Sequence, residues 1–146
     1  MRRALCFALA ALLLLSCSSL APAPISAGDI CFRCSRVITN VKFAGEVIDP
    51  GGFVFKFRTV GCPSKYLADH PTQPKAVFVT DLASGKLVRA EAATFVRTVI
   101  DENTNERDYA AFRLVSDAAS FAREKSAEAI DWHSVVARAG AGQTAG

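Results

Sequence analysis

Apolar and polar residues alternate in several short stretches of the chain, and this pattern predicts antiparallel β-strands. Residues 41–47 and 53–57 place valine and phenylalanine largely at alternate positions. The Asp-Pro-Gly-Gly sequence between them, at residues 49–52, favours a tight turn. The two stretches are therefore predicted to pair as a β-hairpin with one phenylalanine-rich face.

A short helix is predicted after this hairpin. It begins near Gly61, because Pro63 is well tolerated in the first turn of a helix, and it ends before Pro71. The prediction places Cys62 at the helix N-terminus.

A second hairpin is predicted from residues 76–80 and 86–89, which flank an Ala-Ser-Gly turn. Residues 91–98 match neither the strand nor the helix pattern clearly.

The last part of the chain alternates strand and helix again. A strand is predicted over 109–115, a helix over 117–129 with Ser116 or Asp117 as its cap, and a final strand over 130–132. The whole pattern predicts an α+β fold of two successive ββαβ-like units, in which helices cover one side of a mainly antiparallel sheet.

Residues 1–16 have the features of a lipoprotein signal peptide. Arg2 and Arg3 give a basic start, and residues 4–15 form an apolar run that is shorter than the roughly 20 residues of a membrane span. Cleavage before Cys17 would let lipid occupy its thiol and anchor the protein to a membrane, facing the periplasm or the cell exterior. An ordinary secretory signal with a cysteine near its end is the alternative.

The processed chain is expected to contain a lipidated tether at 17–28, one domain at 29–139 and a flexible tail at 140–146. The tether is rich in Pro, Ala and Ser, whereas nine of the ten phenylalanines follow the signal and indicate a packed globular body. The full sequence has 17 basic and 14 acidic residues, and two of the basic ones would leave with the signal. This near balance gives no electrostatic basis for binding nucleic acid.

Three cysteines are expected to keep their side chains free after processing. Cys6 leaves with the signal, which leaves Cys31, Cys34 and Cys62 in the domain. Outside the cytoplasm, thiols are oxidised unless they are paired, bound to metal or kept reduced, and an odd number cannot pair completely. Two interpretations remain open: a soft-metal site, or a Cys31–Cys34 disulfide with Cys62 in the core.

Enzymatic chemistry has little support in the sequence. There is no Gly-rich phosphate loop, Ser-His-Asp arrangement or zinc-protease helix. A thioredoxin-like CxxC follows a strand and opens a helix, whereas residues 31–34 follow a tether. His70 and His133 are possible additional ligands, although each also fits a structural role near a helix end or an aromatic neighbour.

Several short motifs together are similar to one known family. They are Cys-Phe-Arg-Cys at 31–34, Gly-Cys at 61–62, Lys-Tyr-Leu at 65–67 and Val-Phe-Val-Thr-Asp-Leu-Ala-Ser-Gly at 77–85, in addition to the lipoprotein cysteine. This combination resembles the NosL-type lipoproteins, the copper accessory proteins of nitrous oxide reductase. The resemblance implies a doubled ββαβ architecture, also similar to that of the organomercurial lyases, and a non-enzymatic copper(I) carrier.

The chain departs from this family at the methionines. Ser35-Arg36 replaces the family's Gly-Met, Pro63 replaces its Met after Gly-Cys, and the sole methionine, Met1, leaves with the signal. Two or three thiolates suffice for the soft copper(I) ion, so cysteines alone can form the site.

We therefore expect Cys31, Cys34 and Cys62 to bind copper(I). The helix N-terminus and Lys65 are expected to favour the Cys62 thiolate, while Arg33 and Arg36 offset negative charge. The expected function is delivery of copper to an extracytoplasmic partner, and the resemblance suggests nitrous oxide reductase or its assembly machinery as one candidate. The alternative is a thiol-disulfide or structural assembly lipoprotein with a Cys31–Cys34 disulfide.

Overall fold

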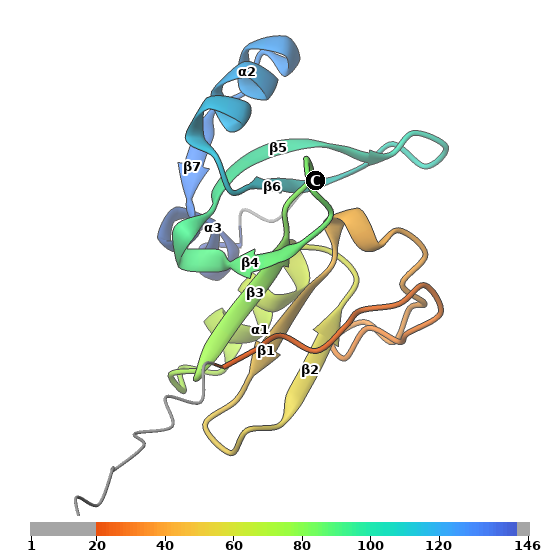
Figure 1. The fold of residues 1–146 in the computed structure, drawn as a ribbon, viewed down its shortest axis with the longest axis vertical. Coiled ribbons are helices and arrows are strands. Elements are labelled where there is room, and N and C mark those ends of the chain that lie inside the picture. Colours follow the sequence, from red (N-terminus) through yellow and green to blue (C-terminus); the bar gives the residue numbers. More distant parts are fainter. Residues whose placement is uncertain (1–19, 143–146) are drawn as a thin grey trace, which may run out of the picture.

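The computed structural model describes residues 20–142 and shows two successive ββαβ units (Figure 1). The signal peptide at 1–16, the lipid site at Cys17 and the end of the tail lie outside these residues. The first unit and the strand appended to it comprise β1 (Gly45–Ile48), β2 (Val54–Phe57), α1 (Gly61–Asp69), β3 (Ala76–Thr80) and β4 (Leu87–Arg89).

The second unit repeats this order and adds a terminal helix. It comprises β5 (Thr94–Asp101), β6 (Glu106–Phe112), α2 (Val115–Lys125), β7 (Ala129–Asp131) and α3 (Trp132–Gly140). Short 3-10 turns at Val41–Phe43 and Ala90–Ala92 lead into β1 and β5. The predicted α+β class and the two-unit order are thus confirmed.

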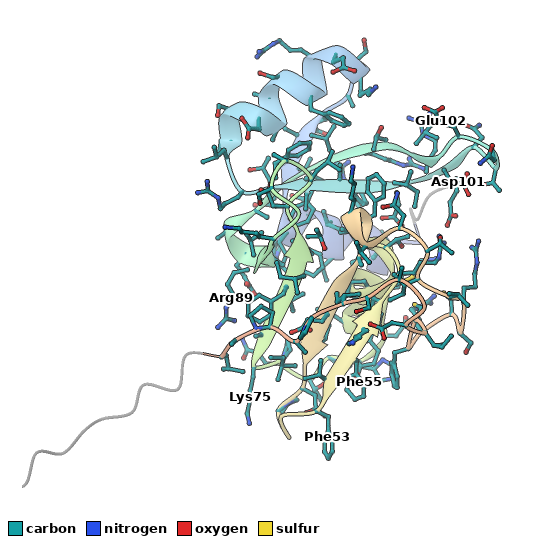
Figure 2. All side chains as sticks on the ribbon, turned by 45° about the vertical axis from the view of Figure 1, so that its right-hand side comes forward. Phe53, Phe55, Lys75, Arg89, Asp101 and Glu102 are labelled. Carbon is teal, nitrogen blue, oxygen red and sulfur yellow. The ribbon has the colours of Figure 1, made fainter. Side chains whose placement is uncertain are left out.

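The strands form two antiparallel sheets, in the orders β2-β1-β3-β4 and β6-β5-β7. A parallel bridge from Asp81 to Ala111 and a hydrogen bond of 2.8 Å from Leu82 N to Ala111 O join the end of the β3 segment to β6. Figure 2 shows that Phe53, in the turn between β1 and β2, lies at the opposite end of the molecule from Asp101 and Glu102, near the turn between β5 and β6.

The strand alternation divides the first sheet into two faces. In β1, Val47 points into the main core, which also contains Phe57 from β2 and Val77 from β3. Glu46 and Ile48 point to the other face, which the N-terminal segment crosses in Figure 1. The main core extends into the second unit through buried residues such as Phe95, Ala111, Ile130, Trp132 and Val135.

The sequence pattern missed or displaced some elements. The unassigned stretch around 91–98 mostly belongs to β5, and α3 was not predicted because Trp132 was assigned to a strand. Instead, Asp131 caps α3: its carboxylate accepts a hydrogen bond of 2.8 Å from Ser134 N. The predicted helix over 117–129 begins earlier, at Val115, and ends at Lys125 because Ser126 adopts a left-handed conformation with φ of 49°. Leu114, not Ser116 or Asp117, occupies its N-cap position.

No helix among residues 20–142 is long and apolar enough to span a membrane.

Candidate metal centre

The structure brings together the three cysteines that the sequence singled out. The Sγ atoms of Cys31, Cys34 and Cys62 all lie within 4.8 Å of one another, and none of the three is in a disulfide. Cys31 is buried, with 1% of its surface exposed, whereas Cys34 and Cys62 are half-buried. Within residues 20–142, these cysteines are the one group of at least three Cys, His, Asp or Glu side chains close enough to share an ion.

A tight backbone loop positions Cys31 and Cys34. Cys31 N donates to Arg36 O and Ser35 N donates to Cys31 O, both at 2.9 Å, and Ser35 has a positive φ of 57°. A bridge between Ile30 and Val37 closes the loop. Phe32 N donates to Lys56 O at 2.8 Å, which attaches the loop to the edge of β2.

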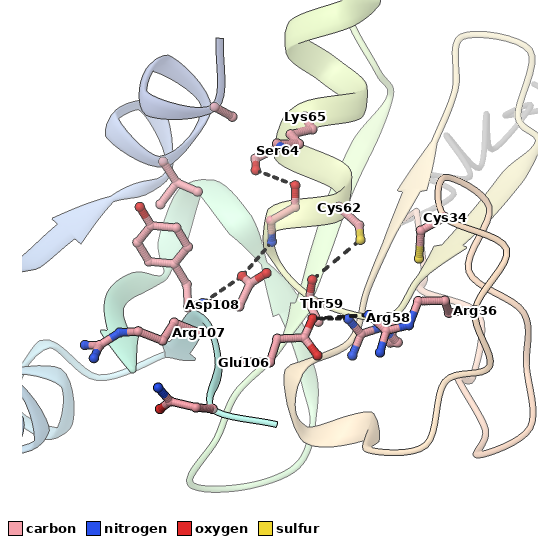
Figure 3. A pocket seen from close by; sticks show the side chains of 15 residues that line it. Cys34, Arg36, Arg58, Thr59, Cys62, Ser64, Lys65, Glu106, Arg107 and Asp108 are labelled. Carbon is pink, nitrogen blue, oxygen red and sulfur yellow. Dashed lines mark hydrogen bonds and ion pairs between the residues drawn. The ribbon is translucent and has the colours of Figure 1, made fainter. Parts of the chain in front are cut away.

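Cys62 comes from a separate element, the first turn of α1, as predicted. The N-cap position of this helix is Val60, whose side chain cannot accept a hydrogen bond. Asp108 of β6 supplies the missing acceptor, because its carboxylate binds Gly61 N at 2.8 Å and Tyr109 N at 2.7 Å. The second unit therefore holds the helix start that carries Cys62 (Figure 3).

A hydrogen bond between the Cys31 and Cys62 side chains shifts the pKa values of these two thiols in opposite directions. A hydrogen bond from the Cys62 thiol lowers the pKa of Cys31 to about 4, opposed by burial and assisted by the backbone N–H groups of Cys34 and Arg58. The same hydrogen bond and burial raise the pKa of Cys62. The hydrogen bond to Cys31 and burial thus act on the pKa of Cys62 in the direction opposite to the expected effect of the helix N-terminus and Lys65.

Arg58 is the cation in contact with the sulfurs. Its guanidinium hydrogen-bonds to Cys34 and to Glu106 of β6, and only 12% of its side chain is exposed. The predicted cations lie farther out: Arg33 pairs with Asp69 at 3.5 Å, and Arg36 pairs with Glu106 at 3.6 Å. Charge compensation at the sulfurs thus comes chiefly from Arg58.

A cavity of about 300 Å³ lies beside two of the three sulfurs. Cys34 and Cys62 form part of its wall, next to Arg58 and Glu106 (Figure 3). Thr59 completes this side, since its hydroxyl donates to Cys62 Sγ at 3.5 Å and also interacts with Asp108. The cavity gives an incoming ligand access to two sulfurs without unfolding the loop.

An aromatic cluster covers the opposite side of the CxxC loop. Phe32, between the two cysteines, packs on Phe55 with ring centroids 4.2 Å apart, and Phe57 and Tyr66 complete the cluster. Cys31 itself belongs to the main hydrophobic core. Phe57 is fully buried but Phe32 is 52% exposed, so the cluster shields this side of the loop from water only in part.

Neither histidine joins the sulfur group. His70 stacks on Tyr66 with ring centroids 4.6 Å apart, and its Nδ1 lies 2.9 Å from Tyr66 O. His133 lies in the first turn of α3, beside Asp131. Both positions agree with the structural roles that the sequence also allowed.

Sequence reasoning missed Arg58, Thr59, Glu106 and Asp108 as parts of the site. Arg58 and Thr59 directly precede the Gly-Cys motif, so their proximity to Cys62 was a usable signal. Glu106 and Asp108 are distant in sequence, and only the packing of β6 against the start of α1 brings them to the sulfurs.

Comparison with known proteins identifies the fold. No protein-family model matches the chain, and no curated protein sequence does. Among solved structures, the copper chaperone NosL from Shewanella denitrificans superposes with a TM-score of 0.62 and 19% identity, over 76% of this chain and 92% of that chain. The chain therefore has a NosL-like fold.

Proposed function

We propose that this protein binds copper(I) through Cys31, Cys34 and Cys62 and delivers it to an acceptor protein outside the cytoplasm. The observation that carries the proposal is the convergence of three sulfur atoms within 4.8 Å of one another. The fold likeness to a copper chaperone supports the same metal. The role is carriage of the ion and involves no catalysed reaction.

Copper(I) fits this donor set better than zinc does. Structural zinc takes four ligands, whereas two or three thiolates suffice for copper(I). Bound copper(I) with three thiolates carries net negative charge, which Arg58 compensates from its contact with Cys34.

The exposure of the sulfurs favours transfer as well as binding. Cys31 is fully buried, but Cys34 and Cys62 face the cavity and are half-buried. A thiolate or thioether of an acceptor can therefore approach the ion from the cavity while Cys31 still holds it. Ligand exchange of this kind needs no free copper ion.

Attachment to a membrane through lipid on Cys17 is part of the proposal. The signal features of residues 1–17 support it, and acyl chains contribute about 0.8 kcal/mol per buried methylene. Nitrous oxide reductase or its assembly machinery is the acceptor that the motif resemblance suggests.

Anaerobic titration with copper(I) against a competing chelator tests the binding. We expect one copper ion per protein when all three thiols are reduced, and a thiol-intact protein that binds none would contradict the proposal. Thiol counting on protein from its native compartment separates the alternative: three free thiols support the carrier, while one supports a structural lipoprotein with a Cys31–Cys34 disulfide.

A further inference from the structure

The first residues of the described chain are fixed to the outer face of the first sheet. Ala23 N donates to both carboxylate oxygens of Glu46, at 3.0 and 3.1 Å. Glu46 is fully buried, and a buried carboxylate is costly without such a donor. Farther along, Gly28 N donates to Ile38 O at 2.9 Å. The segment from Ala23 to Gly28 is thus part of the domain rather than a free spacer.

This attachment leaves only a short link to Cys17. Leu20 follows Cys17 by three positions, and an extended chain spans at most about 3.3–3.6 Å per residue. A lipid on Cys17 would therefore hold Leu20 within about 10 Å of the bilayer interface. Ala23, the first residue bonded to the domain, follows Cys17 by six positions, so this end of the first sheet would lie within about 22 Å of the bilayer interface.

The end at which the described chain begins carries exposed apolar side chains. Phe53, in the turn between β1 and β2, is 69% exposed, and its neighbour Val54 and Leu20 are also exposed. Figures 1 and 2 show the chain entering at the end of the molecule where Phe53 and Lys75 lie. Lys75 packs beside the same turn, since a Cβ on Gly52 would lie 3.6 Å from its Nζ. Exposed apolar side chains in a turn next to basic side chains are typical of surfaces that contact lipid headgroups.

Cations lie beside the turn that carries Phe53, together with the carboxylate of Asp49, which accepts a hydrogen bond of 2.8 Å from Phe53 N. Lys75 and Arg89 lie toward the end with Phe53, and Arg89 donates to Lys75 O at 3.4 Å. The acidic pair Asp101 and Glu102 lies at the opposite end. Lys75 and Arg89 supply cations that can meet anionic headgroups at the end with Phe53.

We propose that the end formed by Leu20, Phe53 and Lys75 rests on an anionic lipid bilayer, with Phe53 inserted among the headgroups. The proposal rests on the lipid attachment at Cys17 but not on copper binding. Lys56, whose carbonyl accepts from Phe32 N of the CxxC loop, follows Phe53 by three positions along β2, so about 10 Å of strand separates Phe53 from that loop. The metal centre would then remain accessible to a soluble acceptor.

Tryptophan fluorescence of the full lipidated protein on vesicles tests this orientation. The vesicles contain phosphatidylethanolamine and phosphatidylglycerol, with or without bromine on the acyl chains near the headgroup. Phe53→Trp is the reporter and Val115→Trp is its control, because both positions are 69% exposed and α2, which begins at Val115, lies at the other end of the molecule (Figure 1). The native Trp132 is only 8% exposed and supplies a constant background.

We expect brominated lipid to quench the tryptophan at position 53 and its emission to shift to the blue, with no change at position 115. A Leu20→Trp variant should behave like the reporter. Equal quenching at both ends, or none at position 53 in protein that floats with the vesicles, would overturn the orientation. Protein that does not float with the vesicles would overturn the lipid attachment and the orientation together. Copper(I) titration of the same samples shows separately whether the metal site is intact.

Discussion

At the scale of single residues, Cys62 decides whether the site has three sulfur ligands or two. Its Sγ lies within 4.8 Å of the other two sulfurs, and it hydrogen-bonds to Cys31. Cys62→Ser replaces a soft ligand by a hard hydroxyl. We expect the affinity for copper(I), measured by chelator competition, to fall by more than the roughly 10–100-fold that loss of an outer-shell partner costs.

The fold should survive this substitution, because serine is well accepted at a helix start. Thermal unfolding of the same variant provides the control. Lowered stability with unchanged copper affinity would place Cys62 in the core and outside the site.

The opposite pKa shifts of Cys31 and Cys62 give the copper affinity a pH dependence. Cys31 is already a thiolate above a pH of about 4, whereas the raised pKa of Cys62 keeps its thiol protonated at neutral pH. Copper(I) must displace that proton, so binding becomes tighter as the pH rises. The slope should be about tenfold per pH unit for each proton released.

Chelator competition across the neutral range measures this slope. The Cys62→Ser variant should show a shallower slope, because it has no thiol proton to lose at that position. An affinity of the unaltered protein that does not change with pH would contradict the proposed proton displacement.

Arg58 should support the charge of the metal-bound sulfurs. It contacts Cys34 and is paired with Glu106, and its side chain is largely buried. Arg58→Gln removes the positive charge but keeps hydrogen-bond donors. We expect copper(I) affinity to fall roughly 10–100-fold, as for other outer-shell partners of metal ligands.

Arg33→Gln is the matched control, since Arg33 pairs with Asp69 and does not contact the sulfurs in the described contacts. Equal losses in both variants would indicate a general effect of surface charge instead of a specific contact.

At the scale of secondary-structure elements, the hairpins and α1 could be predicted because their signals are local. Alternating phenylalanines define β2, and Pro63 marks the first turn of α1. The signals for β5 and α3 are not local in this sense. Phe95 and Val96 are both buried in β5, so the strand lacks an alternating pattern, and Trp132 begins α3 while packing on Phe95 of β5 at 5.5 Å between ring centroids.

The start of α1 depends on an element of the other unit. Asp108 of β6 accepts from Gly61 N, and burial raises the pKa of this carboxyl. Asp108→Ala would leave the Gly61 N–H and neighbouring donors unsatisfied, which should lower the free energy of unfolding by about 1–3 kcal/mol. Copper(I) affinity should fall as well, because the first turn that carries Cys62 loses its anchor.

Denaturant unfolding and copper titration of this variant test both effects. Asp117→Ala is the control, since Asp117 lies in the first turn of α2, far from the sulfurs in the fold. Unchanged stability of Asp108→Ala would exclude its role as the cap of α1.

At the scale of the whole molecule, the sequence singled out the three cysteines that lie together better than it predicted their surroundings. Cys31, Cys34 and Cys62 were recognisable because the compartment and the odd number of thiols restrict their chemistry. The pKa shifts of Cys31 and Cys62 could not be predicted from the sequence, because they depend on the hydrogen bond between these two side chains and on tertiary contacts to Arg58. The two ββαβ units meet at the sulfur cluster. Cys62 lies in the first unit, and β6 of the second unit supplies Asp108, which binds the start of α1, and Glu106, which pairs with Arg58.

X-ray absorption of the copper(I)-loaded protein tests the three-sulfur site most directly. The extended fine structure should show sulfur neighbours near trigonal coordination, and Cys62→Ser should reduce their number to two. A spectrum with two sulfurs in the unaltered protein, or with nitrogen from a histidine, would contradict the assignment of Cys31, Cys34 and Cys62 as the copper ligands.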